Sequence, residues 1–426
     1  MRFKGRRMPL TEIAQELKVD AVIEGTVQRD GGRLKISANL IHAATDTRLW
    51  TGNYDRELKD VLRLQSDVAR AIIQEIQIKL TSQEQTRLAS ASPINPKAYD
   101  AYLRGRFYAN RQIKADNETA ITELERAVDL EPTFAAAQAE LAQAYVWRSH
   151  LFTPEEKQWE VKAFVAVEKS LSLDPDSAVA HQARGRLLWT SANHFPHEKA
   201  IQEYRRALTL NPSLDEAQNQ LALVYNHIGA FDQALQELQK AVTVNPTNNL
   251  AQFRIGQTLV FQGNYEQALT ALRVSPREAN PALVGSNTVM ALLHLGRRDE
   301  AAVMVEEILR DYPEDTDGGL FTGIQALIAA LAGAKDKAES KIRIAVEKGK
   351  GFGHFHHTAY NIACAYSVMK KAGPAVTWLQ KAADDGFPCY PLFEKDPYLD
   401  HLRKDPRFNE LMAKLKTQWE RYQAIL

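Results

Sequence analysis

Small and apolar residues recur at a fixed interval in the middle of the chain. Between Asp215 and Pro246, the spaced positions Leu221, Ala222, Tyr225, Gly229, Phe231, Ala234 and Leu238 recur as Ile255, Gly256, Leu259, Gly263, Tyr265, Ala268 and Leu272, each 34 residues later. An interval of this length fits two helices and a turn. The small side chains allow the two helices to approach closely, and the aromatic and leucine side chains fill the space around them.

Prolines mark the ends of further units of the same kind. Pro132, Pro175, Pro212 and Pro246 are separated by 43, 37 and 34 residues, so the earlier units contain longer turns, at 147–159 and 191–197. Downstream the pattern is looser, but small residues still recur as far as Ala382. We expect about eight helix pairs between residues 98 and 385.

These spaced positions resemble the tetratricopeptide repeat, a helix-turn-helix unit that stacks into a right-handed α-solenoid. The resemblance implies that the first helix of each pair lines the concave side and that ligands contact the second, fifth, ninth, twelfth and thirteenth places of each unit. The candidate residues for binding a peptide or protein are Tyr102, Arg106, Asn110, Gln143, Trp147, Gln182, Arg186, Trp189, Asn219, Asn226, His227, Phe253, Gln257 and Phe261. Amides, arginines and aromatics suit an extended peptide, although each can equally pack on a neighbouring unit.

The first 80 residues follow a different pattern, with apolar and polar residues alternating over short stretches. Leu34, Ile36, Ala38 and Leu40 alternate with polar residues, as in a half-buried strand. The turn at Asp30-Gly31-Gly32 indicates a hairpin. The pattern predicts a helix at 10–18, strands at 21–29, 34–41 and 48–54, and an amphipathic helix at 58–80.

The run from Met8 to Arg56 resembles the later half of the TolB N-terminal-like (FlgO-like) α/β domain of bacterial multidomain proteins. In that family the domain commonly precedes tetratricopeptide repeats. The family's first strand, helix and second strand have no counterpart here, so the sequence resembles a chain that begins inside this domain. In larger relatives the upstream part often contains a winged-helix DNA-binding domain, a serine/threonine kinase or a nucleotide cyclase.

The sequence therefore predicts a mainly α protein, a helical solenoid preceded by a partial α/β domain with a three-stranded antiparallel sheet and two helices. The expected divisions are the partial domain at 1–80, a linker at 81–97, the helix pairs at 98–385, and a C-terminal capping segment and helix at 386–426. Because a partial sheet leaves an edge and part of an apolar face uncovered, residues 1–80 are expected either to form a homodimer or to dock on the first repeats.

Composition and charge exclude several classes of partner. The chain has 53 Lys and Arg against 53 Asp and Glu, which disfavours a protein that mainly coats nucleic acid or anionic lipid. No apolar run is long enough to span a bilayer, and a cytoplasmic location is expected, or a periplasmic one if a membrane segment lies upstream. Cys364 and Cys389 form no CxxC pair and are expected to be buried free thiols.

The sequence contains few groups of residues that resemble a catalytic motif. The sequence lacks the P-loop, HExxH, GxSxG and kinase motifs, so we expect no enzyme activity, no catalytic residues and no cofactor. His354, His356 and His357 have a spacing that allows a shared metal on one helical turn, but no acidic or cysteine ligand adjoins them, and packing against the neighbouring unit is the favoured interpretation.

These observations favour a non-catalytic scaffold or sensor of a bacterial signalling system, which binds a protein or peptide along the concave face. The alternative is the C-terminal regulatory portion of a kinase, an adenylate cyclase or a winged-helix regulator.

Overall fold

The computed structural model of the chain describes residues 9–17, 19–76, 93–109, 111, 113–153, 155–275 and 281–426. These residues form two compact units, Met1–Phe152 and Thr153–Leu426. The chain is mainly α-helical, with one small sheet near its beginning, which confirms the predicted fold class.

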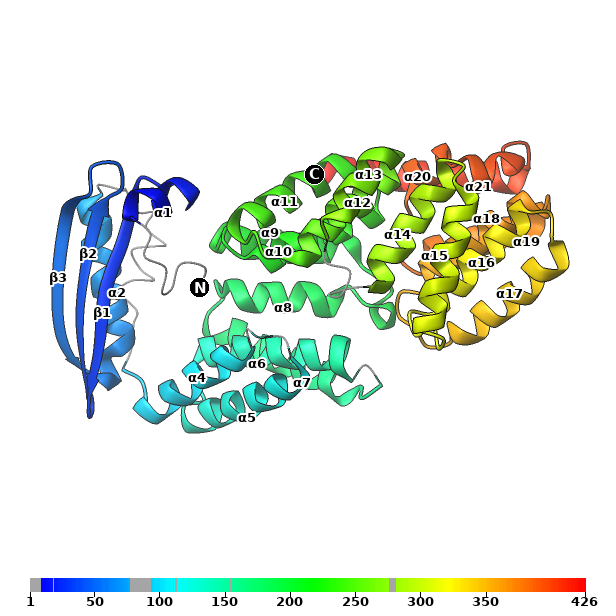
Figure 1. Cartoon of the computed structure of the whole chain (residues 1–426). Coiled ribbons are helices and arrows are strands. Elements are labelled where there is room, and N and C mark those ends of the chain that lie inside the picture. Colours follow the sequence, from blue (N-terminus) through cyan, green and yellow to red (C-terminus); the bar gives the residue numbers. More distant parts are fainter. Residues whose placement is uncertain are drawn as a thin grey trace. The chain divides into compact units, whose positions relative to one another are not determined.

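The first unit contains the sheet and the first long helices (Figure 1). Its elements are α1 (Leu10–Leu17), β1 (Ala21–Asp30), β2 (Arg33–His42), β3 (Thr47–Glu57), a 3-10 turn (Leu58–Asp60), α2 (Val61–Glu75), α4 (Pro96–Ala109), α5 (Lys114–Leu130), α6 (Ala135–Trp147) and a π-helical turn (Arg148–Phe152).

The sheet is antiparallel with the strand order β1-β2-β3. Gly31 and Gly32 form the two-residue turn between Asp30 and Arg33, and Gly31 has a φ of 57°, in the left-handed region that favours glycine. Leu34, Ala38 and Leu40 of β2 are buried, as their alternation predicts, and α2 covers that face. The amphipathic helix begins later than predicted, because residues 58–60 are 3-10, and its predicted part beyond Ile76 lies outside the described residues.

The second unit consists of helices in consecutive antiparallel pairs and a C-terminal segment. The helices are α7 (Gln158–Leu173), α8 (Ala178–Leu188), α9 (His197–Leu210), α10 (Asp215–His227), α11 (Phe231–Val244), α12 (Asn249–Gln262), α13 (Tyr265–Arg273), α14 (Pro281–His294), α15 (Arg298–Asp311), α16 (Leu320–Leu331), α17 (Lys335–Lys348), α18 (His356–Val368), α19 (Ala372–Asp384), α20 (Tyr390–Lys395) and α21 (Pro406–Ile425). Two 3-10 turns lie at Ser191–Asn193 and Pro397–Leu402.

The predicted small residues lie where the two helices of a pair cross. Ala222 and Ala234 are fully buried between α10 and α11. A methyl group on Gly185 of α8 would lie 2.9 Å from the ring of Tyr204 on α9, which is closer than carbon atoms pack. The short side chains at these places are therefore required by helix contact.

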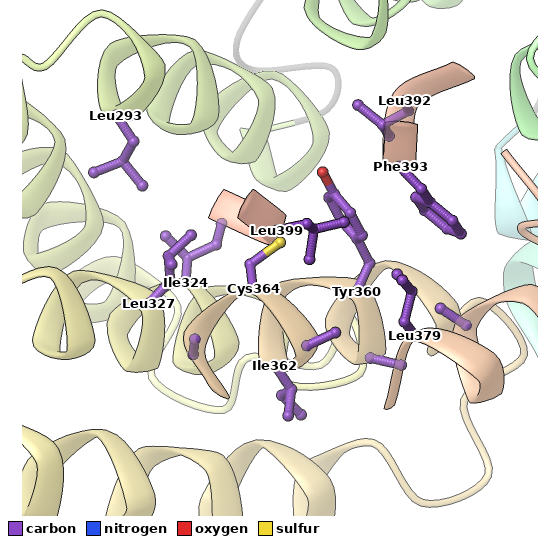
Figure 2. Packing of buried hydrophobic residues seen from close by; sticks show 14 of the residues in the cluster. Leu293, Ile324, Leu327, Tyr360, Ile362, Cys364, Leu379, Leu392, Phe393 and Leu399 are labelled. Atoms are coloured by element: carbon purple, nitrogen blue, oxygen red, sulfur yellow. The ribbon is translucent and has the colours of Figure 1, made fainter. Parts of the chain in front are cut away.

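A large apolar core extends through the later helices of the second unit and includes Leu293, Ile324, Leu327, Ile362 and Leu379 (Figure 2). The C-terminal segment contributes Leu392, Phe393 and Leu399 to the same core. Residues 386–426 thus do more than shield the last helix pair, because their side chains complete the interior.

The last helix returns to the early part of the second unit. The Trp419 indole donates to the Gly229 carbonyl at 3.3 Å, and the Arg205 guanidinium donates to the carbonyls of Ile425 and Leu426 at 2.6 and 3.0 Å. Arg421 also forms an ion pair with Glu198 at 2.6 Å. Helix α21 therefore packs against α9 and the turn before α11, which the sequence did not predict.

Candidate functional site

The predicted binding residues of the first unit take part in internal contacts. Tyr102 is buried with its ring 4.8 Å from that of Phe134, and the Arg106 guanidinium lies over Tyr102 and pairs with Glu140 at 3.1 Å. Burial, reinforced by the charge of Glu140, raises the pKa of Tyr102 to about 12. Gln143 and Trp147 are half-buried, and Asn110 lies outside the described residues. Arg106 is the member of this group with an exposed side chain.

In the second unit most of the predicted residues are buried. Arg186 and Phe261 are half-buried. The buried ones are Gln182, Trp189, Asn219, Asn226, His227, Phe253 and Gln257. Every residue of α10 from Ala217 to His227 is buried, so this helix is partly exposed at its first turn, Asp215 and Glu216, and enclosed beyond it.

Residues of the C-terminal segment fill the inner surface beside the end of α10. The Phe387 ring lies 5.3 Å from that of His227 and 5.5 Å from that of Phe261, and the Cys389 thiol donates to the Asn226 carbonyl at 3.5 Å. Pro391 packs so closely on Gly229 that a methyl group there would lie 2.4 Å from its Cδ. A ligand would have to displace this segment to reach Asn226 or Phe261.

A polar cluster remains at the beginning of α10, between α8 and α12. The Arg186 guanidinium donates to the Gln220 carbonyl oxygen. The Glu216 carboxylate accepts from the amides of Gln220 at 2.6 Å and Asn219 at 3.2 Å. Arg254 of α12 donates through Nη1 to the main-chain and side-chain oxygens of Asn219, at 2.8 and 3.0 Å. We call Arg186, Glu216, Asn219, Gln220 and Arg254 the arginine cluster.

The arginine cluster contains more positive than negative charge. Within the described residues, no carboxylate oxygen lies within 4.0 Å of the guanidinium nitrogens of Arg186 or Arg254. Burial lowers the pKa of Arg254 to about 10, an effect that Glu216 partly offsets. Arg254 therefore remains charged at neutral pH, and the cluster holds two cations for one carboxylate.

Further buried polar atoms have no partner in this part of the structure. They are both amide atoms of Asn226, the carbonyl oxygen of Gln257 and the indole nitrogen of Trp189. Most buried polar groups in proteins have a hydrogen-bond partner. These atoms therefore give the inner surface unused donors and acceptors that packing of the helices does not require.

Sequence reasoning found Arg186 and Asn219 but missed Gln220, Glu216 and Arg254. Arg254 follows the predicted Phe253 directly, so counting repeat places assigned the neighbouring residue. Its side chain reaches Asn219 on the preceding pair, 35 residues earlier. A basic residue on the first helix of one repeat and an amide one period before it are the signal that could have identified this contact.

The two cysteines are free and buried, as predicted. Burial raises the pKa of both thiols, and for Cys364 the nearby Asp396 adds to the effect. Raised thiol pKa values make nucleophilic chemistry unfavourable. No helix in the described ranges has both the length and the apolar character needed to cross a membrane.

Tetratricopeptide repeat models match residues 183–249 and 228–286. A putative adenylate cyclase 3 of Rhizobium meliloti (strain 1021) is 34% identical over 140 residues, which are 33% of this chain and 24% of that protein. The match thus spans about a quarter of the relative's length.

Solved structures with a similar fold include a Rap protein complexed with Competence and Sporulation Factor. It is 14% identical, with a TM-score of 0.56, over 76% of this chain and 98% of that one. A tetratricopeptide repeat protein from Parabacteroides merdae ATCC 43184 is 17% identical, with a TM-score of 0.42, over 65% of this chain and 99% of that one.

Proposed function

We propose that this chain, whose residues 183–286 match tetratricopeptide repeats, is a non-catalytic scaffold that binds a protein or peptide beside the first turn of α10, where Arg186 and Glu216 are partly exposed. The observation that supports this most directly is the arginine cluster, where two cations share one carboxylate. The Rap protein of similar fold was solved with a bound factor, which agrees with a binding role for this kind of fold.

The chemistry of the arginine cluster favours a ligand with a carboxylate. A guanidinium offers five N–H donors in a planar fork that matches a carboxylate. Arg254 uses Nη1 for Asn219, and Arg186 uses Nη1 for Gln220, so each retains donors. An acidic side chain or a terminal carboxylate of an extended peptide would balance the charge of this site.

The proposal predicts that Arg186 selects acidic peptides. Peptides captured by the full chain from a random library should be enriched in Asp, Glu or a free carboxyl terminus. Arg186→Gln should weaken the binding of such a peptide about ten- to a hundredfold, because a hydrogen bond between charged groups is lost. Isothermal titration measures the change.

The matched control is Arg184→Gln on the same helix, where the guanidinium lies near Glu168 and Glu203. This variant should bind as the wild type does. Replacing the peptide's Asp by Asn should reproduce the loss caused by Arg186→Gln and add little to it. Equal affinity of the wild type, Arg186→Gln and Arg254→Lys for every captured peptide would refute the proposed site.

A second proposal is that the chain is the regulatory portion of a nucleotide cyclase or a related signalling protein. The similarity to the putative adenylate cyclase supports it. The genomic sequence directly upstream of Met1 tests this proposal. An in-frame cyclase, kinase or winged-helix domain supports it, and a stop codon followed by an unrelated gene contradicts it.

For the first unit we propose a homodimer through the free edge of β1. Within the described part of the chain, β1 pairs with β2 alone, and its Ile23 and Val27 are 55% and 69% exposed. Pairing two such edges would satisfy the unpaired backbone groups and place side chains of the second copy beside Ile23 and Val27.

A further inference from the structure

Three histidine side chains from two helices meet inside the second unit. His227 lies at the end of α10, and His356 and His357 begin α18. One ring nitrogen from each lies within 4.8 Å of the other two. His227 and His356 are fully buried and His357 is half-buried. We call these three residues the histidine cluster.

Hydrogen bonds fix which nitrogen of each buried ring carries the hydrogen. The His227 Nδ1 lies 2.8 Å from the Leu223 carbonyl, and the His356 Nδ1 lies 2.8 Å from the Asp385 carbonyl. A carbonyl can only accept, so both Nδ1 atoms must donate. In two neutral imidazoles this leaves both Nε2 atoms with lone pairs.

Those two Nε2 atoms face each other at 3.1 Å. Two lone pairs at this distance repel each other, so the arrangement needs a positive group between or beside them. A third hydrogen would require one ring to be charged. Both rings are fully buried against the aromatic side chains of Trp189 and Phe387, which disfavours a charged ring.

A metal ion supplies the missing positive group. Histidine ligands to metals usually donate their other ring nitrogen to a carbonyl or carboxylate, as His227 and His356 do here. Zinc binds imidazole nitrogen at about 2.0–2.1 Å, which places two ligand nitrogens about 3.3–3.4 Å apart in a tetrahedral site. The Nε2 atoms of His227 and His356 already lie close to this separation, at 3.1 Å, and a ring nitrogen of His357 lies within 4.8 Å of the ligand nitrogens of both.

The surroundings of the histidine cluster suit a metal site that is shielded from bulk water. The rings of Trp189, Phe387 and Phe195 lie 4.9 Å from His227, 4.9 Å from His357 and 5.6 Å from His356. These apolar rings limit the access of water. His354 lies beside the cluster, with its ring 5.2 Å from that of His356.

We propose that His227, His356 and His357 bind one divalent transition-metal ion of the zinc class, with a water or His354 in the fourth position. The ion would join α10 to α18, whose ligands lie 129 residues apart. It would hold the early and late helices of the second unit together, independently of whether the arginine cluster binds a peptide.

The test uses the full chain, stripped with EDTA and titrated with zinc chloride. We expect one zinc per chain by calorimetry and metal analysis, and a rise in Tm of about 5 °C at a zinc concentration about a hundredfold above Kd. Cobalt(II) should give the visible absorption of a tetrahedral site.

Variants decide whether the ion binds at this cluster. His227→Gln and His357→Ala should weaken zinc binding more than about a hundredfold, since loss of a supporting contact alone costs ten- to a hundredfold. His401→Ala, at an exposed position, should bind as the wild type does. If His227→Gln does not fold, as judged by circular dichroism, the half-buried His357→Ala decides.

Two outcomes would overturn the proposal. One is a wild type with no stoichiometric zinc and no change in Tm between EDTA and zinc, which would leave a shared proton between His227 and His356. The other is zinc binding that persists unchanged in both variants, which would place the ion elsewhere.

Discussion

At the scale of the residue, His197 of α9 is buried, and each of its two ring nitrogens lies near a polar group of the C-terminal segment. Its Nε2 donates to the Gly386 carbonyl at 3.1 Å, and the Tyr422 hydroxyl lies 3.4 Å from Nδ1. These contacts suit the neutral ring. Burial lowers the pKa of His197 to about 4, with the Gly386 carbonyl partly opposing the effect.

This shift predicts a loss of stability in mild acid. The unfolded chain binds a proton at His197 near pH 6.5 and the folded chain only near pH 4, so the unfolded state binds more protons between these values and stability falls as the pH falls. For this residue the loss from pH 7 to pH 5 is about 2 kcal/mol. Urea unfolding, followed by helix content at the two pH values, measures it.

His197→Phe keeps a ring of similar size and removes this proton. The variant should lose stability at pH 7, because the Gly386 carbonyl loses its donor, but its stability should fall by about 2 kcal/mol less than that of the wild type between pH 7 and pH 5. The same fall in both proteins would contradict the assignment.

Sequence reasoning identified His227 as an inner-surface residue and His356 as one of three neighbouring histidines. The contact between the two residues could not be predicted, because they are 129 residues apart and no local sequence pattern indicates which distant helices touch. The contact depends on the return of the later helices toward α10, which is a property of packing.

At the scale of the element, the helix pairs were predictable because their signals are local. Pro132, Pro175, Pro212 and Pro246 each lie two residues beyond the last residue of α5, α7, α9 or α11. A proline forces the residue before it out of the helical conformation, and Glu131 has a φ of −146°. Gly229 and Gly263 adopt positive φ in the turns between paired helices, where glycine is favoured.

The C-terminal elements were less predictable. The sequence predicts a helix within the capping segment at 386–426, and α21 lies there. Its contacts are not predictable, because amphipathicity indicates that one face of a helix is covered but not what covers it. The contact of Trp419 with Gly229 has no signature in the sequence.

The close crossing of α10 and α11 predicts the cost of a larger side chain. Ala234→Leu should destabilise the protein by about 1–3 kcal/mol, because Ala234 is fully buried at the crossing and the added atoms have no space. Thermal and urea unfolding measure the change. Ala413→Leu, on the exposed side of α21, is the control and should change stability by less than about 0.5 kcal/mol. Equal stabilities of the two variants would contradict the assigned crossing.

At the scale of the whole molecule, the open edge of the sheet predicts the state of association. Ile23 and Val27 face the same side as Leu40 and Ile36, their partners on β2, but remain exposed. The first unit also makes internal contacts near this strand, since Arg29 binds both carboxylate oxygens of Asp100 on α4, at 2.6 and 2.8 Å. These contacts agree with docking on the first repeat and leave the β1 edge unpaired.

If β1 edges pair, light scattering should give twice the mass of one chain, and Val27→Lys should give a single chain, because a charge on an edge strand opposes pairing. Val303→Lys, at another exposed apolar residue on α15, should leave the mass unchanged. A wild type that remains a single chain at all concentrations would exclude the dimer.

The packing of α21 against the early helices also affects how the second unit folds during its synthesis. Contacts within a helix pair form between residues close in the chain, whereas Trp419 and Gly229 are 190 residues apart, and Tyr422 and His197 are 225 apart. On a ribosome adding about 5–20 residues per second, α9 and the turn before α11 would wait roughly ten to forty seconds for the helix that covers them. During that interval their apolar surface is open to chaperones and to neighbouring nascent chains.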